Sequence, residues 1–125
     1  MGRLTGKVAV ITGAGCVAPG WGNGRAASVL FAREGATVVG TDINLDAMEE
    51  TANLLRETGG EHYLARCDVT DSASIENLVE DVLSRYGRID VLVNNVGGSA
   101  KGGAVEMSEE LWLKQLNYNL TSVFL

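Results

Sequence analysis

Residues 8–24 read VAVITGAGCVAPGWGNG, and this stretch decides the fold. Residues 8–11 form an apolar, largely β-branched run, which is typical of a strand buried on both faces of a parallel sheet. Glycines follow at once, and apolar side chains then recur at helical spacing over residues 24–33. Glycine permits a tight turn, and the start of a helix offers unpaired N–H groups to a phosphate. The stretch therefore predicts a strand, a phosphate-binding turn and a helix; the alternative is a glycine-rich turn that binds nothing.

The same alternation of strand and helix continues along the chain. Strands are predicted at 36–40, at 62–66 and within 88–94, and helices near 45–58, at 72–86 and from Ser108 onward, with a flexible loop at 97–103. Asp71 or Ser72 is the predicted cap of the third helix. Parallel strands joined by helical crossovers favour an α/β fold. We predict one domain, residues 1–125, with a doubly wound parallel sheet of about four strands in the order 3-2-1-4.

Composition narrows the possible functions. The 125 residues are 46% hydrophobic and 21% charged, with a formal net charge of −6. The acidic balance argues against nucleic acid as a partner, because phosphate-backbone binders need clustered Lys and Arg. Cys16 and Cys67 have neither a disulfide-framework pattern nor a metal-ligand spacing. No secretory leader is apparent, and the apolar runs are too short for a membrane span. We therefore expect a cytoplasmic protein without a metal site.

The last residues predict that more protein follows. Residues 120–125 are mostly apolar and contain no Gly, Pro or basic residue to end a helix. The fourth predicted strand is also apolar, and soluble proteins usually cover or charge a sheet edge of that kind. We expect further chain to pack there.

Asp42 is the first candidate for contact with a ligand. It ends the second predicted strand, 18 positions after Gly24, close to the spacing at which an acidic residue binds a ribose 2′-hydroxyl. Its charge would repel a 2′-phosphate, and no Arg or Lys lies between Asp42 and Asn53. This pattern favours NAD over NADP. The alternative is that Asp42 caps the next helix, although Asn44 is better placed to do so.

Two further polar segments follow strands at the same sheet edge. Asp68-Val69 follows the third strand, and Asn94-Asn95-Val96-Gly97 follows the fourth. Ligands of open α/β sheets bind at the carboxyl ends of the strands. Asp68 is placed to bind an adenine amino group, and Asn95 to hold either a ribose or the neighbouring strand. The alternative for both is a turn former that ends its strand.

Taken together with Asn117-Tyr118-Asn119-Leu120, these motifs resemble, in order and spacing, the N-terminal half of the short-chain dehydrogenases/reductases. The resemblance implies a Rossmann fold, a nicotinamide cofactor and hydride exchange between a small alcohol and a carbonyl compound. It also implies a homo-oligomer for the complete protein. It assigns Asn119 as the catalytic asparagine, whose backbone holds a water linked to a lysine in the family's proton relay. The cofactor-binding residues that it implies are Gly13, Gly22, Asn23, Gly24, Asp42, Ile43, Asp68, Val69, Asn95 and Gly97.

The sequence departs from the family pattern in two places. Gly13 and Gly22 are nine positions apart where the family has four, so residues 16–20 form an insertion of five. The family's Tyr-x-x-x-Lys pair is also not in this sequence, since its three tyrosines are followed four positions on by Cys67, Asp90 and Ser122. We therefore interpret the chain as the cofactor-binding part of an oxidoreductase that is inactive by itself. The alternative is a non-catalytic NAD-binding module or pseudoenzyme, whereas a methyltransferase leaves the asparagine motifs without a role.

Two other features are weaker candidates. His62 is the only histidine and starts the third predicted strand, at the edge opposite the expected ligand site, so a catalytic role is disfavoured. Trp112, Leu113 and Leu116 lie on the last predicted helix. They are either ordinary core or, as the family resemblance implies, part of a subunit interface, and we favour the interface for Trp112.

Overall fold

The computed structural model describes residues 2–16 and 18–125. Val17, which belongs to the predicted insertion, lies outside the described residues, as does Met1. The described chain contains one parallel sheet in the order β3-β2-β1-β4, so the predicted strand order is confirmed. The strands are β1 (Val8–Thr12), β2 (Thr37–Asp42), β3 (His62–Arg66) and β4 (Val91–Val93).

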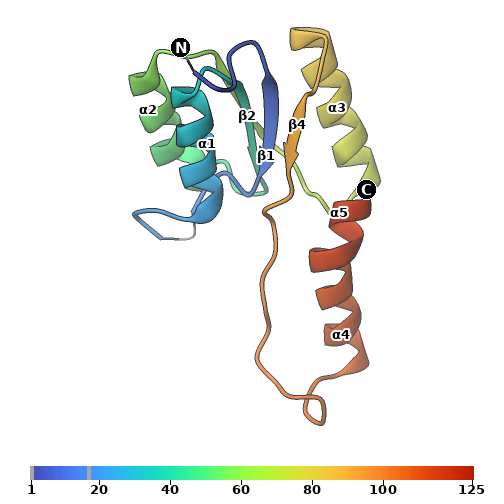
Figure 1. Cartoon of the computed structure of the whole chain (residues 1–125). Coiled ribbons are helices and arrows are strands. Elements are labelled where there is room, and N and C mark those ends of the chain that lie inside the picture. The colour runs from blue at the N-terminus through green and yellow to red at the C-terminus, as the bar shows by residue number, and fades with distance from the viewer. Residues whose placement is uncertain (1, 17) are drawn as a thin grey trace.

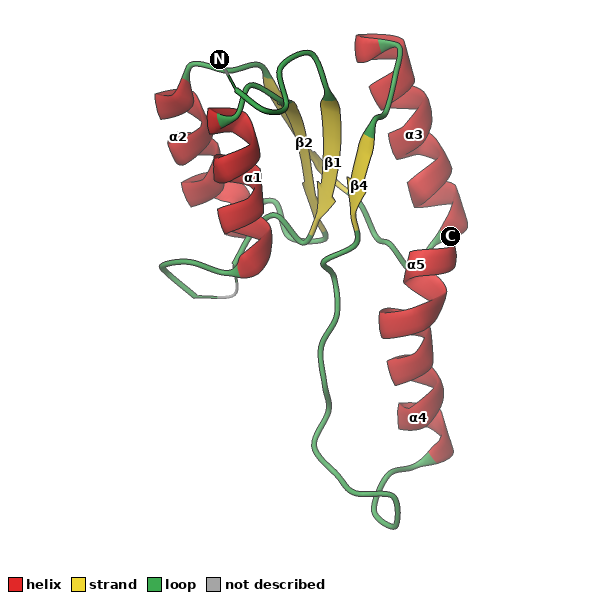
Figure 2. Ribbon diagram, in the orientation of Figure 1, coloured by secondary structure: helices red, strands yellow, loops and turns green. Residues whose placement is uncertain are grey.

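Helices cover both faces of this sheet. In Figure 1, α1 and α2 lie on one side of the strands and α3 lies on the other. Figure 2 shows α4 beyond the ends of the strands, and the chain after it returns to α5 at the lower end of α3. The arrangement is the predicted doubly wound one. The helical elements are α1 (Asn23–Arg33), η1 (Asp46–Met48), α2 (Glu49–Thr58), α3 (Ser72–Tyr86), α4 (Glu109–Leu116), the π-helical turn η2 (Asn117–Thr121) and α5 (Ser122–Phe124).

The central strand β1 is buried on both faces, as its continuous apolar run predicts. Alternate side chains of a strand point to opposite faces. Val8 and Val10 accordingly belong to the cluster on the α3 side, together with Val82. Ala9 and Ile11 belong to the other cluster, which includes residues of α1 and α2. This double burial fixes the position of the turn that follows β1.

Local signals set the helix boundaries. Asp71 is the N-cap of α3, since its side chain accepts a hydrogen bond from the Ala73 N–H. Ser108 caps α4 in the same way, with the Leu111 N–H as donor. Gly87 ends α3 in the left-handed conformation, at φ +74°, which a residue without a Cβ adopts at no steric cost. Of the two residues proposed for the α3 cap, the structure selects Asp71.

Three element boundaries differ from the sequence prediction. Strand β2 covers Thr37–Asp42 and so ends at Asp42 as expected, two residues beyond the apolar run at 36–40, because Thr41 pairs with Thr12 of β1 and Asp42 with Arg66 of β3. The helix predicted near residue 45 begins as the short 3-10 turn η1 before α2. The segment from residue 117 continues the helix through η2 and α5, with a wider π-helical turn that apolar periodicity does not reveal.

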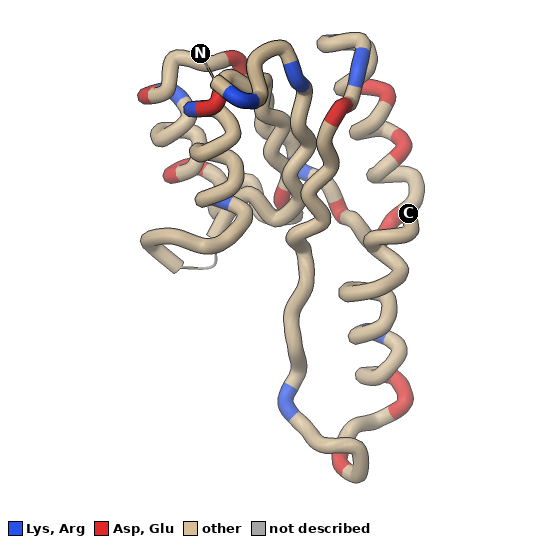
Figure 3. Tube along the Cα trace, viewed as in Figure 1, with Lys and Arg blue, Asp and Glu red and all other residues tan. Residues whose placement is uncertain are grey.

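The surface of the described residues matches the acidic composition. The Lys and Arg residues are scattered along the trace among more numerous Asp and Glu residues (Figure 3). Strand β4 lies at one edge of the sheet, and its Leu92 is 56% exposed. None of the described helices combines the length and the apolar character that a bilayer crossing requires.

Candidate functional site

A cleft of about 560 Å³ lies where the strands end, which is the expected place in an open α/β sheet. Its volume falls within the range of small-molecule sites. The lining comes from the segments that follow the four strands and from η1 and η2. The lining residues are Gly13, Gly15, Cys16, Asp42, Ile43, Asn44, Ala47, Cys67, Asp68, Val69, Asn95, Val96, Gly97 and Tyr118.

The turn after β1 is packed too closely for side chains at several positions. Gly13 has a φ of +65°, a conformation that favours glycine. A Cβ on Gly24 would lie 1.9 Å from the carbonyl oxygen of Gly13, so the start of α1 rests directly on this turn. A Cβ on Gly15 would lie 2.8 Å from the carbonyl oxygen of Ala47. The glycines therefore let α1, the turn and η1 meet around the cleft.

Asp42 directs its carboxylate to the glycine turn. Its Oδ2 accepts a hydrogen bond from the Gly15 N–H at 3.1 Å, and its Oδ1 accepts from the Asn44 N–H at 3.1 Å. Asn44 in turn accepts from the Asp46 N–H at 3.0 Å, at the entry to η1. Asn44 thus holds the start of the next helical turn, as its position suggested. Asp42 links β2 to the turn after β1 and faces the cleft.

Asp68 lines the cleft after the end of β3 and also forms a local turn. One of its carboxylate oxygens accepts hydrogen bonds from the Thr70 hydroxyl, at 2.6 Å, and from the Thr70 N–H, at 3.0 Å. These bonds lower the pKa of Asp68, chiefly through the hydroxyl. The turn-forming alternative is therefore present, and it keeps a negative charge on this side of the cleft at neutral pH.

Asn95 joins the ends of β1 and β4. Its side-chain Nδ2 donates to the carbonyl oxygen of Gly13 at 3.1 Å, and its backbone N–H donates to the Thr12 hydroxyl at 3.1 Å. The same hydroxyl donates to the carbonyl oxygen of Val93. Of the two roles considered for Asn95, the structure shows the contact with the neighbouring strand. This contact joins two lining residues of the cleft, Gly13 and Asn95.

Asn119 lies in the π-helical turn η2, and its side chain forms hydrogen bonds with the loop after β4. Its Oδ1 accepts from the Gly98 N–H, and its Nδ2 donates to the Gly98 carbonyl oxygen, both at 2.9 Å. Nδ2 also donates to the carbonyl oxygen of Gln115. A Cβ on Gly97 would lie 2.9 Å from Asn119 Oδ1, so the missing side chain permits this contact. Wider turns of this kind are frequent at functional sites.

Comparison with known proteins gives the family. The family model for short chain dehydrogenases, which describes the sequences of that family, matches residues 7–125. The chain belongs to the short-chain dehydrogenase family. The 3-oxoacyl-(acyl-carrier-protein) reductase of Thermotoga maritima is 45% identical over 125 residues, which is 98% of this chain and 48% of that protein. The chain therefore spans about half the length of this curated relative.

Solved structures of short-chain dehydrogenases have the same fold. A Burkholderia xenovorans protein of this type matches with a TM-score of 0.96 at 55% identity, covering 99% of this chain and 47% of that one. Carveol dehydrogenase of Mycobacterium avium, solved in complex with NAD, matches with a TM-score of 0.89 at 29% identity, covering 99% of this chain and 48% of that one. The sheet and its helices thus form part of the Rossmann-like fold of short-chain dehydrogenases.

Most of the cofactor-binding residues expected from the sequence of this short-chain dehydrogenase lie together. The cleft is lined by Gly13, Asp42, Ile43, Asp68, Val69, Asn95 and Gly97. Gly22, Asn23 and Gly24 are set back from that lining, at the N-cap and first turn of α1. Asn119 is also outside the lining, although its neighbour Tyr118 belongs to it. His62 lies at the start of β3, at the other end of the strands.

Several cleft residues were not predicted from the sequence. Gly15 belongs to the glycine stretch but had no role of its own, and its close approach to Ala47 depends on where η1 lies. Cys16, Ala47 and Tyr118 also line the cleft. Their residue types carry no sequence signal for this position. Only the folded arrangement of β1, η1 and η2 identifies them.

Removing the Asn119 side chain should loosen the loop after β4. In an Asn119→Ala variant, the Gly98 N–H loses its acceptor, so we expect its amide hydrogen exchange to accelerate about tenfold, equivalent to roughly 1.4 kcal/mol of lost protection. Asn117→Ala in the same helical turn is the control, because no side-chain hydrogen bond of Asn117 is found among the described residues. Equal exchange at Gly98 in the two variants would contradict this role.

Proposed function

We propose that this chain is the cofactor-binding part of a short-chain dehydrogenase that uses NAD to interconvert a small alcohol and a carbonyl compound. The observation that carries the proposal is the position of Asp42, whose carboxylate meets the glycine turn at the rim of the cleft. A carboxylate in this place can accept hydrogen bonds from the hydroxyls of an adenine ribose. When bound, NAD supplies the hydride-accepting group.

The start of α1 is suited to the pyrophosphate. Its N-cap, Gly22, makes no side-chain capping bond, and its first turn contains no acidic residue. By contrast, α4 has a Ser108 cap and begins with Glu109 and Glu110. Free N–H groups and the positive end of the helix dipole favour an anion. This supports the assignment of Gly22, Asn23 and Gly24 to the pyrophosphate loop.

The charges around the cleft favour NAD over NADP. Asp42 and Asp68 are acidic, and the described lining contains no Lys or Arg. A 2′-phosphate beside Asp42 would meet a negative charge without a cation to compensate it. The similar carveol dehydrogenase was solved with NAD. Asp68 and Val69 are placed to receive the adenine, and Asn95 and Gly97 lie toward the nicotinamide side.

Substrate chemistry requires a proton donor within hydrogen-bond reach of the reacting oxygen. We propose that Asn119 belongs to the catalytic machinery through its backbone in η2. The sequence has no Tyr-x-x-x-Lys pair to complete that machinery. The 125 residues by themselves are therefore proposed to bind NAD without oxidising an alcohol. A role as an NAD-binding module without catalysis is the alternative, and it makes the same binding prediction.

We also propose that the complete protein is a homo-oligomer. On α4, Trp112 and Leu113 are 56% and 55% exposed, and no residue of this helix is buried. The described residues do not bury these side chains, and large exposed apolar side chains suit an interface. A cytoplasmic location is proposed because Cys16 and Cys67 are free thiols.

Binding calorimetry on the chain tests the proposal. We expect NAD to bind, and NADP to bind at least about tenfold more weakly, a difference of roughly 1.4 kcal/mol. Addition of primary and secondary alcohols to the NAD complex should produce no NADH absorbance. Tighter binding of NADP than of NAD would contradict the assignment of Asp42. Release of NADH would contradict the proposed inactivity of the isolated chain.

A further inference from the structure

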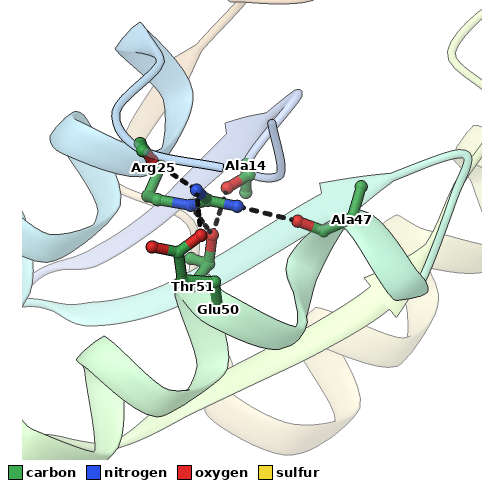
Figure 4. A network of polar contacts seen from close by, with 6 residues as sticks. Ala14, Arg25, Ala47, Glu50 and Thr51 are labelled. Atoms are coloured by element: carbon green, nitrogen blue, oxygen red, sulfur yellow. Dashed lines mark hydrogen bonds and ion pairs between the residues drawn. The ribbon is translucent and has the colours of Figure 1, made fainter. Parts of the chain in front are cut away.

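One charged side chain is fully enclosed beside the cleft, although nothing in the proposed function uses it. Arg25, in the first turn of α1, is 2% exposed. All three nitrogens of its guanidinium donate hydrogen bonds (Figure 4). The acceptors are the Thr51 hydroxyl at 2.8 Å, the Glu50 carboxylate at 2.9 Å, the Ala47 carbonyl at 3.0 Å and the Gly20 carbonyl.

These acceptors belong to separate parts of the chain. Gly20 lies in the extended loop between β1 and α1, Ala47 lies in η1, and Glu50 and Thr51 lie in α2. A guanidinium presents its donors in a rigid planar fork, so it fixes the relative positions of its partners. A buried cation also costs free energy unless it is fully paired. Arg25 therefore fixes the positions of the loop, η1 and α2 relative to one another.

The same network reaches the turn that lines the cleft. Thr51 accepts from Arg25 and donates its own hydroxyl proton to the carbonyl oxygen of Ala14 at 2.8 Å. Ala47 accepts from Arg25 and also from the Cys16 N–H at 3.3 Å. Ala14 and Cys16 flank Gly15, whose N–H donates to Asp42. The residue that meets the Asp42 carboxylate is therefore held from both sides by partners of Arg25.

We propose that Arg25 is a positioning residue for the dinucleotide, which acts through Thr51 and Ala47 to hold the turn at Ala14, Gly15 and Cys16 against Asp42. The inference rests on the proposed function. Arg25 does not line the cleft, so it does not touch the ligand itself. Its effect is on the adenine-ribose half of the site, because Gly15 and Asp42 lie there. Loss of the network lets the turn move away from Asp42 and weakens dinucleotide binding without removing any group that contacts the ligand.

Substitution of Thr51 separates this role from general packing. Thr51→Val preserves the volume of this fully buried side chain but removes the hydroxyl that joins Arg25 to Ala14. Thr51→Ser retains the hydroxyl. We expect Thr51→Val to weaken binding of both NAD and AMP about fivefold, as for one lost buried hydrogen bond, and Thr51→Ser to restore it. AMP is the probe for the adenine-ribose half.

Arg25→Met is the second variant, because methionine keeps an apolar side chain of similar length and removes the guanidinium with its hydrogen-bond donors. We expect a loss of NAD and AMP affinity at least as large as in Thr51→Val. Val82→Ala, in the core on the α3 side, is the control for stability. It should lower the melting temperature while leaving the dissociation constant unchanged at temperatures where the chain is folded.

Amide exchange of the ligand-free chain supplies a readout independent of binding. The Gly15 and Cys16 amides should exchange faster in Thr51→Val and Arg25→Met than in Val82→Ala. If the unaltered chain binds no NAD, the proposed function itself fails. If the unaltered chain binds NAD and Thr51→Val binds it equally well with unchanged Gly15 exchange, Arg25 has no positioning role and only this inference is overturned.

Discussion

Replacing Gly24 by alanine is expected to cost the chain both stability and NAD binding. A Cβ at this position would lie 1.9 Å from the carbonyl oxygen of Gly13 and 2.7 Å from the Nδ2 atom of Asn95. Neither atom can move freely, because Asn95 Nδ2 donates to that same carbonyl oxygen. Relief of the clash requires α1 to move away from the turn. Overpacking of this kind costs about 1–3 kcal/mol or more.

Urea denaturation and calorimetry measure the two effects of Gly24→Ala. We expect the free energy of unfolding to fall by at least about 2 kcal/mol and NAD affinity to fall by more than about tenfold, because the start of α1 is displaced from the phosphate site. Gly60→Ala is the matched control, since a Cβ there would lie 3.6 Å from its nearest neighbour, in ordinary contact. Wild-type NAD affinity in Gly24→Ala would show that α1 and the turn do not form the binding site.

The fold could be predicted from the sequence because its signals are local and agree with one another. The run at residues 8–11 indicates a doubly buried strand, and both core clusters contain β1 residues. Strand β3 and helix α3 have the predicted bounds because turn or capping residues delimit each of them. The apolar run at 36–40 does not include Thr41 and Asp42, which belong to β2 because they pair with Thr12 of β1 and Arg66 of β3, residues distant in sequence. The π-helical turn η2 was missed because it changes the backbone without changing the apolar pattern.

The candidate site was predictable only in part. Positions at the ends of predicted strands indicated Asp42, Asp68 and Asn95, because parallel strands end at one edge and the residues there meet. Whether such a polar side chain binds a ligand or another part of the chain depends on contacts with residues distant in sequence, which local patterns do not show. Asn95 holds the Gly13 carbonyl, for example. The buried Arg25 was not predicted, since a lone arginine in a helix is usually a solvated residue.

Replacing Asp42 by alanine is expected to remove the preference for NAD over NADP. The substitution deletes the acceptor for the ribose hydroxyls and also the acceptor of the Gly15 N–H. Hydrogen bonds to a charged group contribute about 1.5–3 kcal/mol, so NAD affinity should fall by roughly tenfold to a hundredfold. NADP affinity should fall less, because the repulsion of the 2′-phosphate disappears at the same time. Calorimetry with both dinucleotides measures the ratio.

Asp42→Asn divides the Asp42 effect into its two causes. Its amide oxygen can still accept from the Gly15 N–H, so the turn keeps its place, while the charge that repels a 2′-phosphate is gone. We therefore expect both Asp42→Asn and Asp42→Ala to lose the preference for NAD over NADP. NAD affinity should fall less in Asp42→Asn than in Asp42→Ala. Asp46→Ala removes an equal charge from η1, outside the cleft lining, and should leave the ratio unchanged. Asp42 is the one acidic side chain of the described lining that shares a hydrogen bond with the glycine turn. If both Asp42 variants keep the original ratio of NAD affinity to NADP affinity, the adenine ribose binds elsewhere.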